Sequence, residues 1–368
     1  GGPVAVKLAE DPNFNVTLAD IDAAVLDKIS AKHKITVLRV DLSEFKRVKK
    51  LVASYGLVVS AVPGFLGFMV LKACIEAGKD IIDFTFQAEN FLELDSLAKE
   101  HNVTAICDMG LAPGMSNLLA AYASSKLDKP ESVKILVGGL PVRRSWPFEY
   151  KAVFSPIDLV EEYTRPARFV VNGNLVVKPA LSDVENVEIE GLGTLEAFNS
   201  DGLRSLIHTL KVPDMIEKTL RYPGHVLRVQ VLRDAGFFST QPMMAGNVSV
   251  RPIDVTAKLL FPILRIEDGE EDLTVMRIIA EGYKDGKKTR ICYDLLDTFD
   301  PVTRVHSMAR TTGYAAVMAV KLVASQMYTV KGVSAPEHLA ADEKCVDFIL
   351  NGLKELGINY TQRIEAIE

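Results

Sequence analysis

The strongest constraint on the fold is an alternation, within residues 1–118, of short apolar segments with segments that carry apolar residues at helical spacing. The short apolar segments predict buried strands, and the segments between them predict amphipathic helices. Strands that alternate with helices form a parallel sheet with helices on both faces. The predicted strands are residues 15–18, 35–39, 57–60, 80–83 and 104–107, and the predicted helices are residues 23–32, 43–55, 65–76 and 91–101.

The chain opens with GGPVAVKLAEDPNFNVTLADID, a pattern typical of the second half of a dinucleotide-binding βαβ unit. In the complete unit a buried strand precedes G-x-G-x-x-G, whose first two glycines allow the turn and the close approach of the pyrophosphate. Gly1 and Gly2 are suited only to the third glycine position. We therefore expect a Rossmann-type, doubly wound parallel sheet that lacks its first, central strand, and an N-terminally incomplete sequence.

Acidic residues lie just after the first two predicted strands, at the edge where such sheets bind ligands. Asp20 is placed to accept hydrogen bonds from the adenosine ribose and to repel a 2′-phosphate, which favours NAD over NADP. A solvated strand-end acid is the alternative for Asp20, and Asp22 is a second candidate for the ribose. Asp41 either faces the adenine or caps the next helix.

Two loops at the same edge are expected to lie along the nicotinamide half of the cofactor. The proline of SAVPG fixes the turn after residues 57–60, although this segment is equally typical of a plain strand-to-helix turn. CDMGLAPGMSN places Asp108 at the crevice, and its glycines and proline can bring backbone against a planar ring. The residues expected to bind the cofactor are Gly1, Gly2, Asp20, Asp41, Ser60, Ala61, Val62, Pro63, Pro113 and Gly114.

The sequence changes character after Ser116. Residues from about 130 to 305 contain β-rich segments, and the polar stretches DGEED and KDGKK predict the turns of antiparallel hairpins. A second domain with an antiparallel sheet is the simplest interpretation. A helical run then returns at residues 307–326, and we expect it to pack on the first domain.

Composition excludes several classes of protein. The net charge is −6 over 368 residues and the basic residues are scattered, which argues against nucleic acid as a partner. Four cysteines at irregular spacing indicate no zinc site or other metal site and no disulfide framework, and they favour a cytoplasmic location. The most apolar stretch contains Pro63, Gly64 and Gly67 and reaches Lys72 before it is long enough to span a membrane.

Three segments of the second domain concentrate polar groups between glycines and prolines: GGLPVRRSWPFEY, GTLEAFNSDGLRS and KTLRYPGHV. Arginines, carboxylates, a tyrosine and a histidine in such loops suit a pocket for a small zwitterion. A single histidine such as His225 is more often a surface or hydrogen-bonded structural residue than a base.

These segments resemble the saccharopine dehydrogenase-like family over nearly the whole chain, and within it the branch of the bacterial lysine 6-dehydrogenases. The resemblance rests on TLADID, DMGLAPGMSN, VGGLPVRRSWPFEYKAVFS, GTLEAFNSDG, KTLRYPGHV, YKDGKKT, MARTTGY and KGVSAPE. It implies an inserted α/β domain that holds the substrate and forms a homodimer. The expected organisation is a Rossmann domain at 1–118, the inserted domain at 119–306, and a C-terminal helical segment at 307–368 that packs back on the Rossmann domain.

The resemblance implies an enzyme that uses NAD to deaminate the ε-amine of L-lysine oxidatively, giving a semialdehyde that cyclises to a piperideine carboxylate. Asp108 or Asp83 is expected near the amine, with Glu149 and Tyr150 as polar groups of the pocket. Arg221 is the expected clamp for the substrate carboxylate, and His225 is a candidate proton acceptor. Arg143 and Glu196 complete the predicted substrate-binding residues.

Two rival interpretations remain open. One is a saccharopine or carboxyspermidine dehydrogenase of the same family, which needs a further basic clamp that Arg143, Arg144 or Arg204 would supply. The other is a non-catalytic binding or scaffold protein that lacks the phosphate loop. The first rival predicts a second acidic group on the substrate, and the second predicts no binding of nicotinamide.

Overall fold

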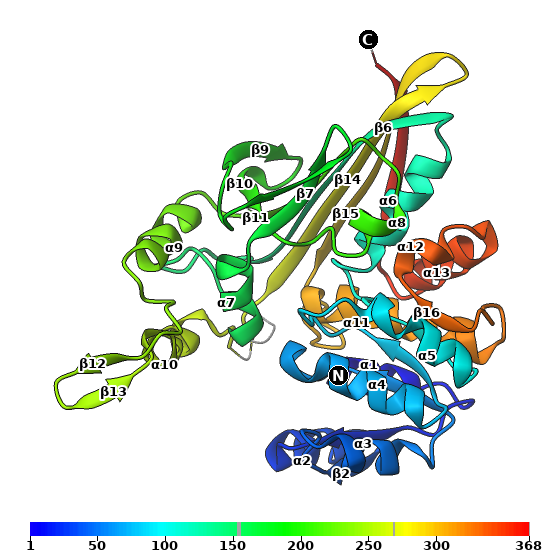
Figure 1. Ribbon diagram of the computed structural model, residues 1–368, viewed down its shortest axis with the longest axis vertical. Helices are drawn as coiled ribbons and strands as arrows, with labels where there is room; N and C mark the ends of the chain where they lie inside the picture. The colour runs from blue at the N-terminus through cyan, green and yellow to red at the C-terminus, as the bar shows by residue number, and fades with distance from the viewer. Residues whose placement is uncertain (153–155, 268, 368) are drawn as a thin grey trace. The chain divides into compact units, whose positions relative to one another are not determined.

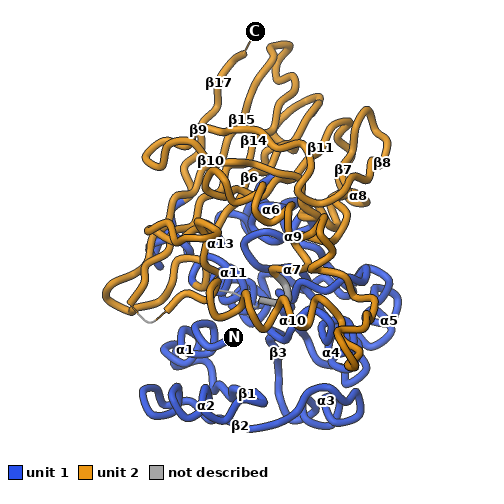
Figure 2. The backbone as a smooth tube through the Cα atoms, turned by 90° about the vertical axis from the view of Figure 1, so that its left-hand side faces the viewer, with its two compact units in different colours: residues 1–122, 310–359 blue, residues 123–309, 360–368 orange. Residues whose placement is uncertain are grey.

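The computed structural model describes residues 1–152, 156–267 and 269–367, whose helices and strands are labelled in Figure 1. The chain divides into two compact units (Figure 2). Unit 1 consists of Gly1–Tyr122 and Arg310–Asn359, and unit 2 consists of Ala123–Ala309 and Tyr360–Glu368. Both units are therefore built from two separate stretches of sequence.

Unit 1 contains parallel strands, as the alternation of strands and helices predicts. In the described part of the chain they form a four-stranded sheet in the order β16-β5-β4-β3 and a separate two-stranded sheet, β1-β2. A complete doubly wound sheet has a central strand that would pair with both β1 and β3. Among the described residues, β1 and β2 do not pair with the other parallel strands. The strands are β1 (Thr17–Asp20), β2 (Thr36–Arg39), β3 (Leu57–Ser60), β4 (Asp80–Asp83), β5 (Thr104–Ile106) and β16 (Gly332–Ser334).

Helices connect these strands and bury one apolar face each. The core of the four-stranded sheet includes Leu71 and Cys74 of α4 together with Ile81 and Ala105 of the strands. The helical elements are α1 (Gly2–Ala9), α2 (Ala23–Ser30), α3 (Phe45–Val52), α4 (Gly64–Glu76), η1 (Phe91–Leu94), α5 (Asp95–Glu100), α12 (Pro336–Leu339) and α13 (Glu343–Glu355). Two further helices, α6 (Met115–Ser125) and α11 (Ser307–Ala324), cross from one unit into the other.

The described residues of unit 2 form a nine-stranded, mainly antiparallel sheet with the path β17-β15-β14-β6-β11-β10-β9, and β7 and β8 lie off this path. Only β6 and β11 pair in parallel within it. The strands are β6 (Lys129–Pro141), β7 (Ala167–Val171), β8 (Asn174–Lys178), β9 (Glu185–Ile189), β10 (Gly193–Asn199), β11 (Asp214–Arg221), β14 (Asp272–Lys284), β15 (Lys287–Thr298) and β17 (Tyr360–Ala366).

One apolar cluster joins this sheet to helices of unit 2. It contains Leu159 and Tyr163 of α7, Val226 of α9, and Leu195 and Leu220 of the sheet. The remaining elements are α7 (Pro156–Thr164), α8 (Leu206–Thr209), α9 (His225–Asp234), α10 (Pro252–Leu264) and the hairpin of β12 (Met243–Ala245) with β13 (Val248–Val250).

Two features of unit 2 correct the sequence-based expectation. KDGKK is the turn of the β14–β15 hairpin, as predicted. Of DGEED, Asp268 lies outside the described residues, and the rest leads from α10 into β14, so it does not join two strands of a hairpin. The apolar residues before DGEED have helical spacing over a full 13-residue helix, which outweighs the local turn signal. The C-terminal segment is also not entirely helical, because Tyr360–Ala366 pairs with β15 of unit 2.

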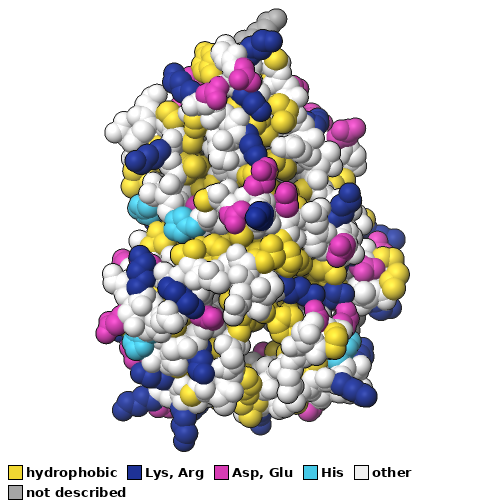
Figure 3. All heavy atoms as spheres, turned by 90° about the vertical axis from the view of Figure 1, so that its right-hand side faces the viewer, with side chains coloured by type: hydrophobic (Ala, Val, Ile, Leu, Met, Phe, Trp, Pro, Cys, Tyr) yellow, Lys and Arg dark blue, Asp and Glu magenta, His cyan; other side chains and the backbone are white. Residues whose placement is uncertain are grey.

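Charged side chains of both signs are interspersed on the face drawn in Figure 3, consistent with the scattered basic residues of the sequence. All four cysteines are free and buried. Among the described residues, the helices are all too short or too polar to cross a bilayer.

Candidate active site

Asp20 and Asp22, both candidates for the cofactor ribose, have different roles in unit 1. Asp22 is the N-cap of α2, because its side chain accepts hydrogen bonds from Ala24 N and Val25 N. Asp20 is the last residue of β1, and its Oδ1 accepts a hydrogen bond from Asp22 N at 2.9 Å. Helix capping thus accounts for Asp22 and leaves Asp20 as the strand-end acid.

Asp41 organises the turn after β2. Its Oδ1 accepts from Ser43 N at 2.9 Å, and Arg47 Nη1 donates to its carbonyl oxygen at 3.0 Å. Hydrogen bonds from Ser43 lower the pKa of Asp41. The N-cap of α3 is Glu44, so the alternative that Asp41 caps this helix is wrong.

The SAVPG segment runs from the end of β3 into α4, with Pro63 at the N-cap position of the helix. Gly1 lies beside it, because a Cβ at Gly1 would be 3.6 Å from Ala61 Cβ. Gly2 begins α1 and faces α2, where a Cβ would be 3.2 Å from Ile29 Cδ1. The structure therefore brings Gly1 together with the loop that contains Ser60, Ala61, Val62 and Pro63.

Asp83 ends β4 and is fully buried. Thr85 Oγ1 lies 3.0 Å and 2.9 Å from its two carboxylate oxygens, and Gln87 Nε2 lies 3.4 Å from Oδ2. Burial raises the pKa of Asp83 to about 7, and the nearby Asp108 carboxylate acts in the same direction. Asp83 can therefore exchange a proton near neutral pH, which an ordinary aspartate does not do.

The loop after β5 fixes the backbone around Asp108. Gly110 and Gly114 form a backbone bridge around Pro113, and Met115 N donates to Gly110 O at 3.0 Å. Gly114 has φ 139°, and a Cβ there would overlap the carbonyl oxygen of Gly110, so only glycine fits. Asp108 itself is buried and has φ 55°.

This edge of unit 1 fits a nicotinamide dinucleotide at the positions that the structure describes. Asp20 places a carboxylate at a strand end, and glycine backbone lies beside the turn into α4. When bound, such a cofactor would supply the acceptor for a hydride. The acids Asp83 and Asp108 come from the neighbouring strands β4 and β5 of the same parallel sheet.

Arg221 is at the centre of a buried polar cluster in unit 2. Its Nη2 lies 2.9 Å and 2.8 Å from the two carboxylate oxygens of Glu162, and its Nη1 donates to Leu220 O at 2.8 Å. The guanidinium carbon lies 4.3 Å from the centre of the Tyr150 ring. The predicted carboxylate clamp is therefore a cation already paired with a carboxylate of the chain.

His225 contacts the same cluster. Its Nδ1 lies 2.7 Å from Phe148 O and its Nε2 lies 2.9 Å from the Tyr163 hydroxyl. A carbonyl oxygen only accepts, so Nδ1 donates to it and Nε2 accepts from the tyrosine in the neutral ring. Burial, together with nearby Arg221, lowers the pKa of His225 to about 3. His225 is therefore uncharged at neutral pH.

The other predicted substrate residues lie in different surroundings. Glu196 accepts from Gly224 N at 2.9 Å and from Val226 N at 3.3 Å, so it caps α9. Glu149 is paired with Arg228 at 3.7 Å, and Arg143 is exposed. The structure groups Tyr150, Arg221 and His225 together.

Sequence reasoning missed Glu162 and Glu217 in unit 2. Glu217 is buried, its Oε2 accepts from Ser200 Oγ at 2.7 Å and from Gly202 N at 3.1 Å, and burial raises its pKa to about 8. A period of two along β11 places Glu217, Thr219 and Arg221 on one face, and this pattern could have identified Glu217. Glu162 has no comparable signal, because it stands beside Glu161 on an ordinary amphipathic helix.

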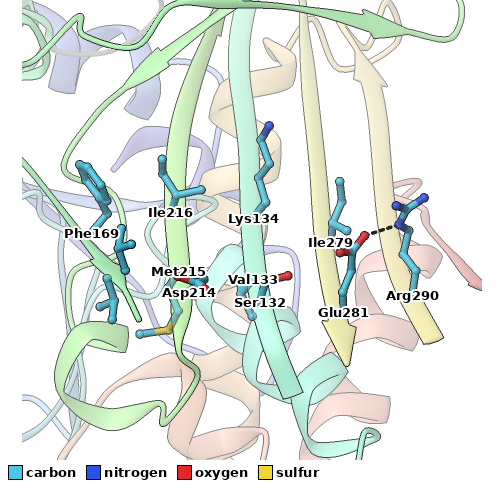
Figure 4. A pocket seen from close by; sticks show the side chains of 12 residues that line it. Ser132, Val133, Lys134, Phe169, Asp214, Met215, Ile216, Ile279, Glu281 and Arg290 are labelled. Carbon is cyan, nitrogen blue, oxygen red and sulfur yellow. Dashed lines mark hydrogen bonds and ion pairs between the residues drawn. The ribbon is translucent and has the colours of Figure 1, made fainter. Parts of the chain in front are cut away.

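Unit 2 also has a hollow of about 450 Å³ on its sheet, drawn in Figure 4. Its charged side chains have partners within the chain: Glu281 pairs with Arg290 at 2.6 Å and Lys134 with Glu185 at 2.9 Å. Asp214 accepts a hydrogen bond from Asn172 N at 2.9 Å. This hollow contains none of the predicted site residues.

Comparison with known families gives two adjoining matches. Residues 1–106 match the saccharopine dehydrogenase NADP binding domain, and residues 110–358 match the saccharopine dehydrogenase C-terminal domain.

Individual relatives agree with these matches. Mitochondrial alpha-aminoadipic semialdehyde synthase of Mus musculus is 28% identical over 68% of this chain, which covers only 29% of that longer protein. Saccharopine dehydrogenase [NADP(+), L-glutamate-forming] of Pyricularia oryzae is 23% identical, with 97% of this chain and 95% of that protein covered.

Two solved structures share the fold. Apo saccharopine dehydrogenase (L-Glu forming) from Saccharomyces cerevisiae has a TM-score of 0.81 at 20% identity and covers 99% of this chain and 97% of its own. Homospermidine synthase from Legionella pneumophila, in complex with NAD, has a TM-score of 0.66 at 11% identity. The match covers 98% of this chain and 89% of that one.

Proposed function

The chain belongs to the saccharopine dehydrogenase family, and we propose that it oxidises the ε-amine of L-lysine with NAD. In the proposed reaction Cε loses a hydride to the cofactor while the nitrogen lone pair forms a C=N bond. Water then adds to this carbon and ammonia leaves, which gives the 6-semialdehyde. The free α-amine condenses with the aldehyde, with loss of water, to give piperideine-6-carboxylate.

The reacting amine must be neutral, because an ammonium has no lone pair to form the C=N bond. Free lysine carries its ε-proton at neutral pH, with an ordinary pKa near 10.4. A base must therefore accept that proton before the hydride leaves.

The proposal rests mainly on the environment of Asp83. Its pKa of about 7 makes it a stronger base than an ordinary aspartate, and it ends a strand at the ligand-binding edge of the sheet. Asp108 follows the next strand and supplies a second carboxylate that attracts the ammonium form. We assign proton acceptance to Asp83 and attraction of the amine to Asp108.

The proposal predicts that kcat/KM for lysine rises from pH 7 to pH 10, as more of the ε-amine loses its proton. Asp108→Asn is expected to raise KM for lysine by at least about tenfold, the effect of roughly 1.4 kcal/mol of lost attraction, and to leave KM for NAD unchanged. Steady-state kinetics with NAD followed at 340 nm measure both. A flat pH profile, or a variant that loses NAD instead, would contradict the assignment.

Asp20 supports NAD as the preferred cofactor, since its carboxylate would repel the 2′-phosphate of NADP. We expect Asp20→Ser to lower the ratio of kcat/KM with NAD to kcat/KM with NADP by about tenfold or more. This change corresponds to the loss of roughly 1.4 kcal/mol of discrimination against NADP. The matched control is Asp22→Ser, which alters a helix cap only. Faster turnover with NADP by the unaltered protein would overturn the preference.

Saccharopine in place of lysine tests the main alternative within the family. A higher kcat/KM for saccharopine than for lysine would replace the proposed substrate. Absence of NAD and NADP binding would instead favour the scaffold interpretation. The homodimer implied by the sequence resemblance stays a prediction that light scattering would test.

A further inference from the structure

We propose that strand β17 pairs edge to edge with β17 of a second copy of this chain, in antiparallel register, with Ile364 opposite the same residue of the second copy. Two observations carry this inference: β17 has an open edge, and its charged side chains complement one another when the strand meets itself in reverse. The inference concerns unit 2 alone and does not depend on the proposed oxidation of lysine.

Strand β17 forms one end of the nine-stranded sheet of unit 2 (Figure 2). In the described part of the chain it pairs with β15 alone, and every residue of β17 after Tyr360 is exposed. An edge strand of this kind presents unpaired backbone N–H and C=O groups, which are a template for another strand.

The usual protection of an edge strand is only partly present in β17. Prolines, bulges and charged side chains protect many edge strands from pairing. β17 has no proline and pairs with β15 in one continuous register, without a bulge. Its charges, Arg363 and Glu365, discourage pairing with most strands but not with a strand of complementary charge.

The order of the charges in β17 selects one register for pairing between two copies. A two-fold axis that crosses the sheet can be centred on any residue of the strand. If it is centred on Arg363 or on Glu365, two like charges face each other, which destabilises the pair. If it is centred on Ile364, Arg363 of each copy faces Glu365 of the other. The remaining centres within β17 oppose no two charged residues.

This register also continues a row of alternating charges that already crosses the sheet. Glu281 of β14 pairs with Arg290 of β15 at 2.6 Å, and Arg290 pairs with Glu365 at 3.2 Å. The next position in the row would be occupied by Arg363 of the second copy. Glu365 and Arg363 each have a partner in their own chain, Arg290 and Asp294, yet their side chains remain 56% and 55% exposed. Both therefore keep room for a partner in the second copy.

The opposite face of β17 and the far end of the sheet agree with this assignment. Ile364 is 54% exposed, and the two-fold axis would bring it against Ile364 of the second copy. Strand β9, at the other end of the path, carries only the acidic Glu185 and Glu188 as charges. Two copies of β9 would repel each other in every register, so β17 is the end of the path that suits self-pairing.

Two charge reversals test the register. We expect Arg363→Glu and Glu365→Arg each to raise the dissociation constant of the dimer by at least about tenfold, because each places two pairs of like charges across the two-fold axis. An equimolar mixture of the two variants should associate as tightly as the unaltered protein, since every charge then faces an opposite charge. Sedimentation equilibrium measures all three dissociation constants.

The matched control is Glu188→Arg, which reverses an exposed charge at the other end of the path and should leave the dissociation constant unchanged. Each β17 variant also loses an ion pair within its own chain. That loss could weaken β17 in either variant, but it cannot make the two variants bind each other, so recovery in the mixture reports pairing between chains.

A pair of cysteine variants tests the same register without altering charge. Directly opposed residues of antiparallel strands have Cβ atoms about 4.5–5.5 Å apart, close to the separation that a disulfide needs. Ile364→Cys should therefore form a cross-linked dimer when oxidised with diamide. Gln362→Cys should not, because position 362 lies opposite position 366 in this register. The four native cysteines are buried and free, which keeps the background low.

Several results would overturn the inference. An unaltered protein that stays monomeric at every concentration measured rules out the pairing. A dimer that neither charge reversal weakens has its interface elsewhere, and a mixture that does not recover association has a different register. If the charge variants do not fold, the cysteine variants decide, and cross-linking at position 362 that equals or exceeds that at position 364 contradicts the proposed register.

Discussion

Unit 1 and unit 2 each bury a carboxylate, Asp83 and Glu217, but they do so by different means. In unit 1 the acid stands at the end of a parallel strand, and its partners Thr85 and Gln87 follow within four residues of sequence. In unit 2 the partners of Glu217 come from a separate segment, Ser200 to Gly202. Local chain geometry therefore builds the first site, and packing between distant segments builds the second.

The surrounding charge also differs between the two sites. The hydrogen-bond partners of Asp83 are a hydroxyl and an amide, and the nearby Asp108 carries the same charge as Asp83. In unit 2 the acids near Glu217 are paired with arginines: Glu162 with Arg221 and Asp201 with Arg168 at 2.8 Å. The buried acids of unit 1 thus lie beside a like charge, whereas the acids near Glu217 in unit 2 are balanced by arginines.

The largest expected effect comes from adding one methyl group to a glycine of each unit. Gly114→Ala should lower the free energy of unfolding by more than about 4 kcal/mol, because the Cβ meets the fixed backbone of Gly110 at positive φ. Gly202→Ala should lower the free energy of unfolding by only about 1–3 kcal/mol, since the Cβ meets the Glu217 side chain, which can shift. Denaturant titration measures both.

The matched control for this pair is Gly56→Ala, where a Cβ would have open space. It should change the free energy of unfolding by less than about 0.5 kcal/mol. Equal costs at Gly114 and Gly202 would show that the packing of unit 2 is as rigid as the loop of unit 1.

A smaller effect is expected in the pH dependence of stability. Burial raises the pKa of Asp83 from 3.8 to about 7 and that of Glu217 from 4.5 to about 8. The folded protein then holds protons that the unfolded chain has lost, so the free energy of unfolding falls as pH rises from about 4 to about 8. Asp83→Asn and Glu217→Gln should each flatten this fall, measured by denaturant titration at successive pH values.

Each tenfold difference in proton affinity corresponds to about 1.4 kcal/mol, so the flattening should amount to a few kcal/mol for either variant. Glu10→Gln is a suitable control because Glu10 forms only a surface ion pair with Lys7. If neither variant changes the slope, both carboxyls titrate as they do in the unfolded chain.

The smallest expected effect concerns helix caps. Asp22 caps α2 from the position next to it, while Glu196 caps α9 from strand β10, more than 25 residues away in sequence. Asp22→Ala should lower the free energy of unfolding by about 1 kcal/mol. Glu196→Ala should lower it by about 2 kcal/mol, because the loss of Glu196 leaves backbone N–H groups unpaired in a less exposed place. Thermal unfolding measures both, and a larger cost at Asp22 would reverse the contrast.

The features that could be predicted from the sequence are those that depend on short-range order. Strands β3 and β4 were predicted with the bounds that the structure has, and the positions of Asp20 and Asp83 at strand ends followed directly. The gap in the parallel sheet could also be inferred, since the fingerprint has a known order of strand, glycines and helix. The hairpin at KDGKK followed from its turn residues.

The contacts between residues of unit 2 could not be predicted, because they depend on how its helices pack on its sheet. Glu162 and Arg221 are separated by 59 residues, and His225 reaches Tyr163 across 62. No periodic pattern within a helix or strand encodes such pairs, because they arise when a helix packs on a sheet whose strands are not consecutive in sequence. The same physics distinguishes Arg221 from Arg143: both stand in polar segments, but packing buried one beside a carboxylate and left the other exposed.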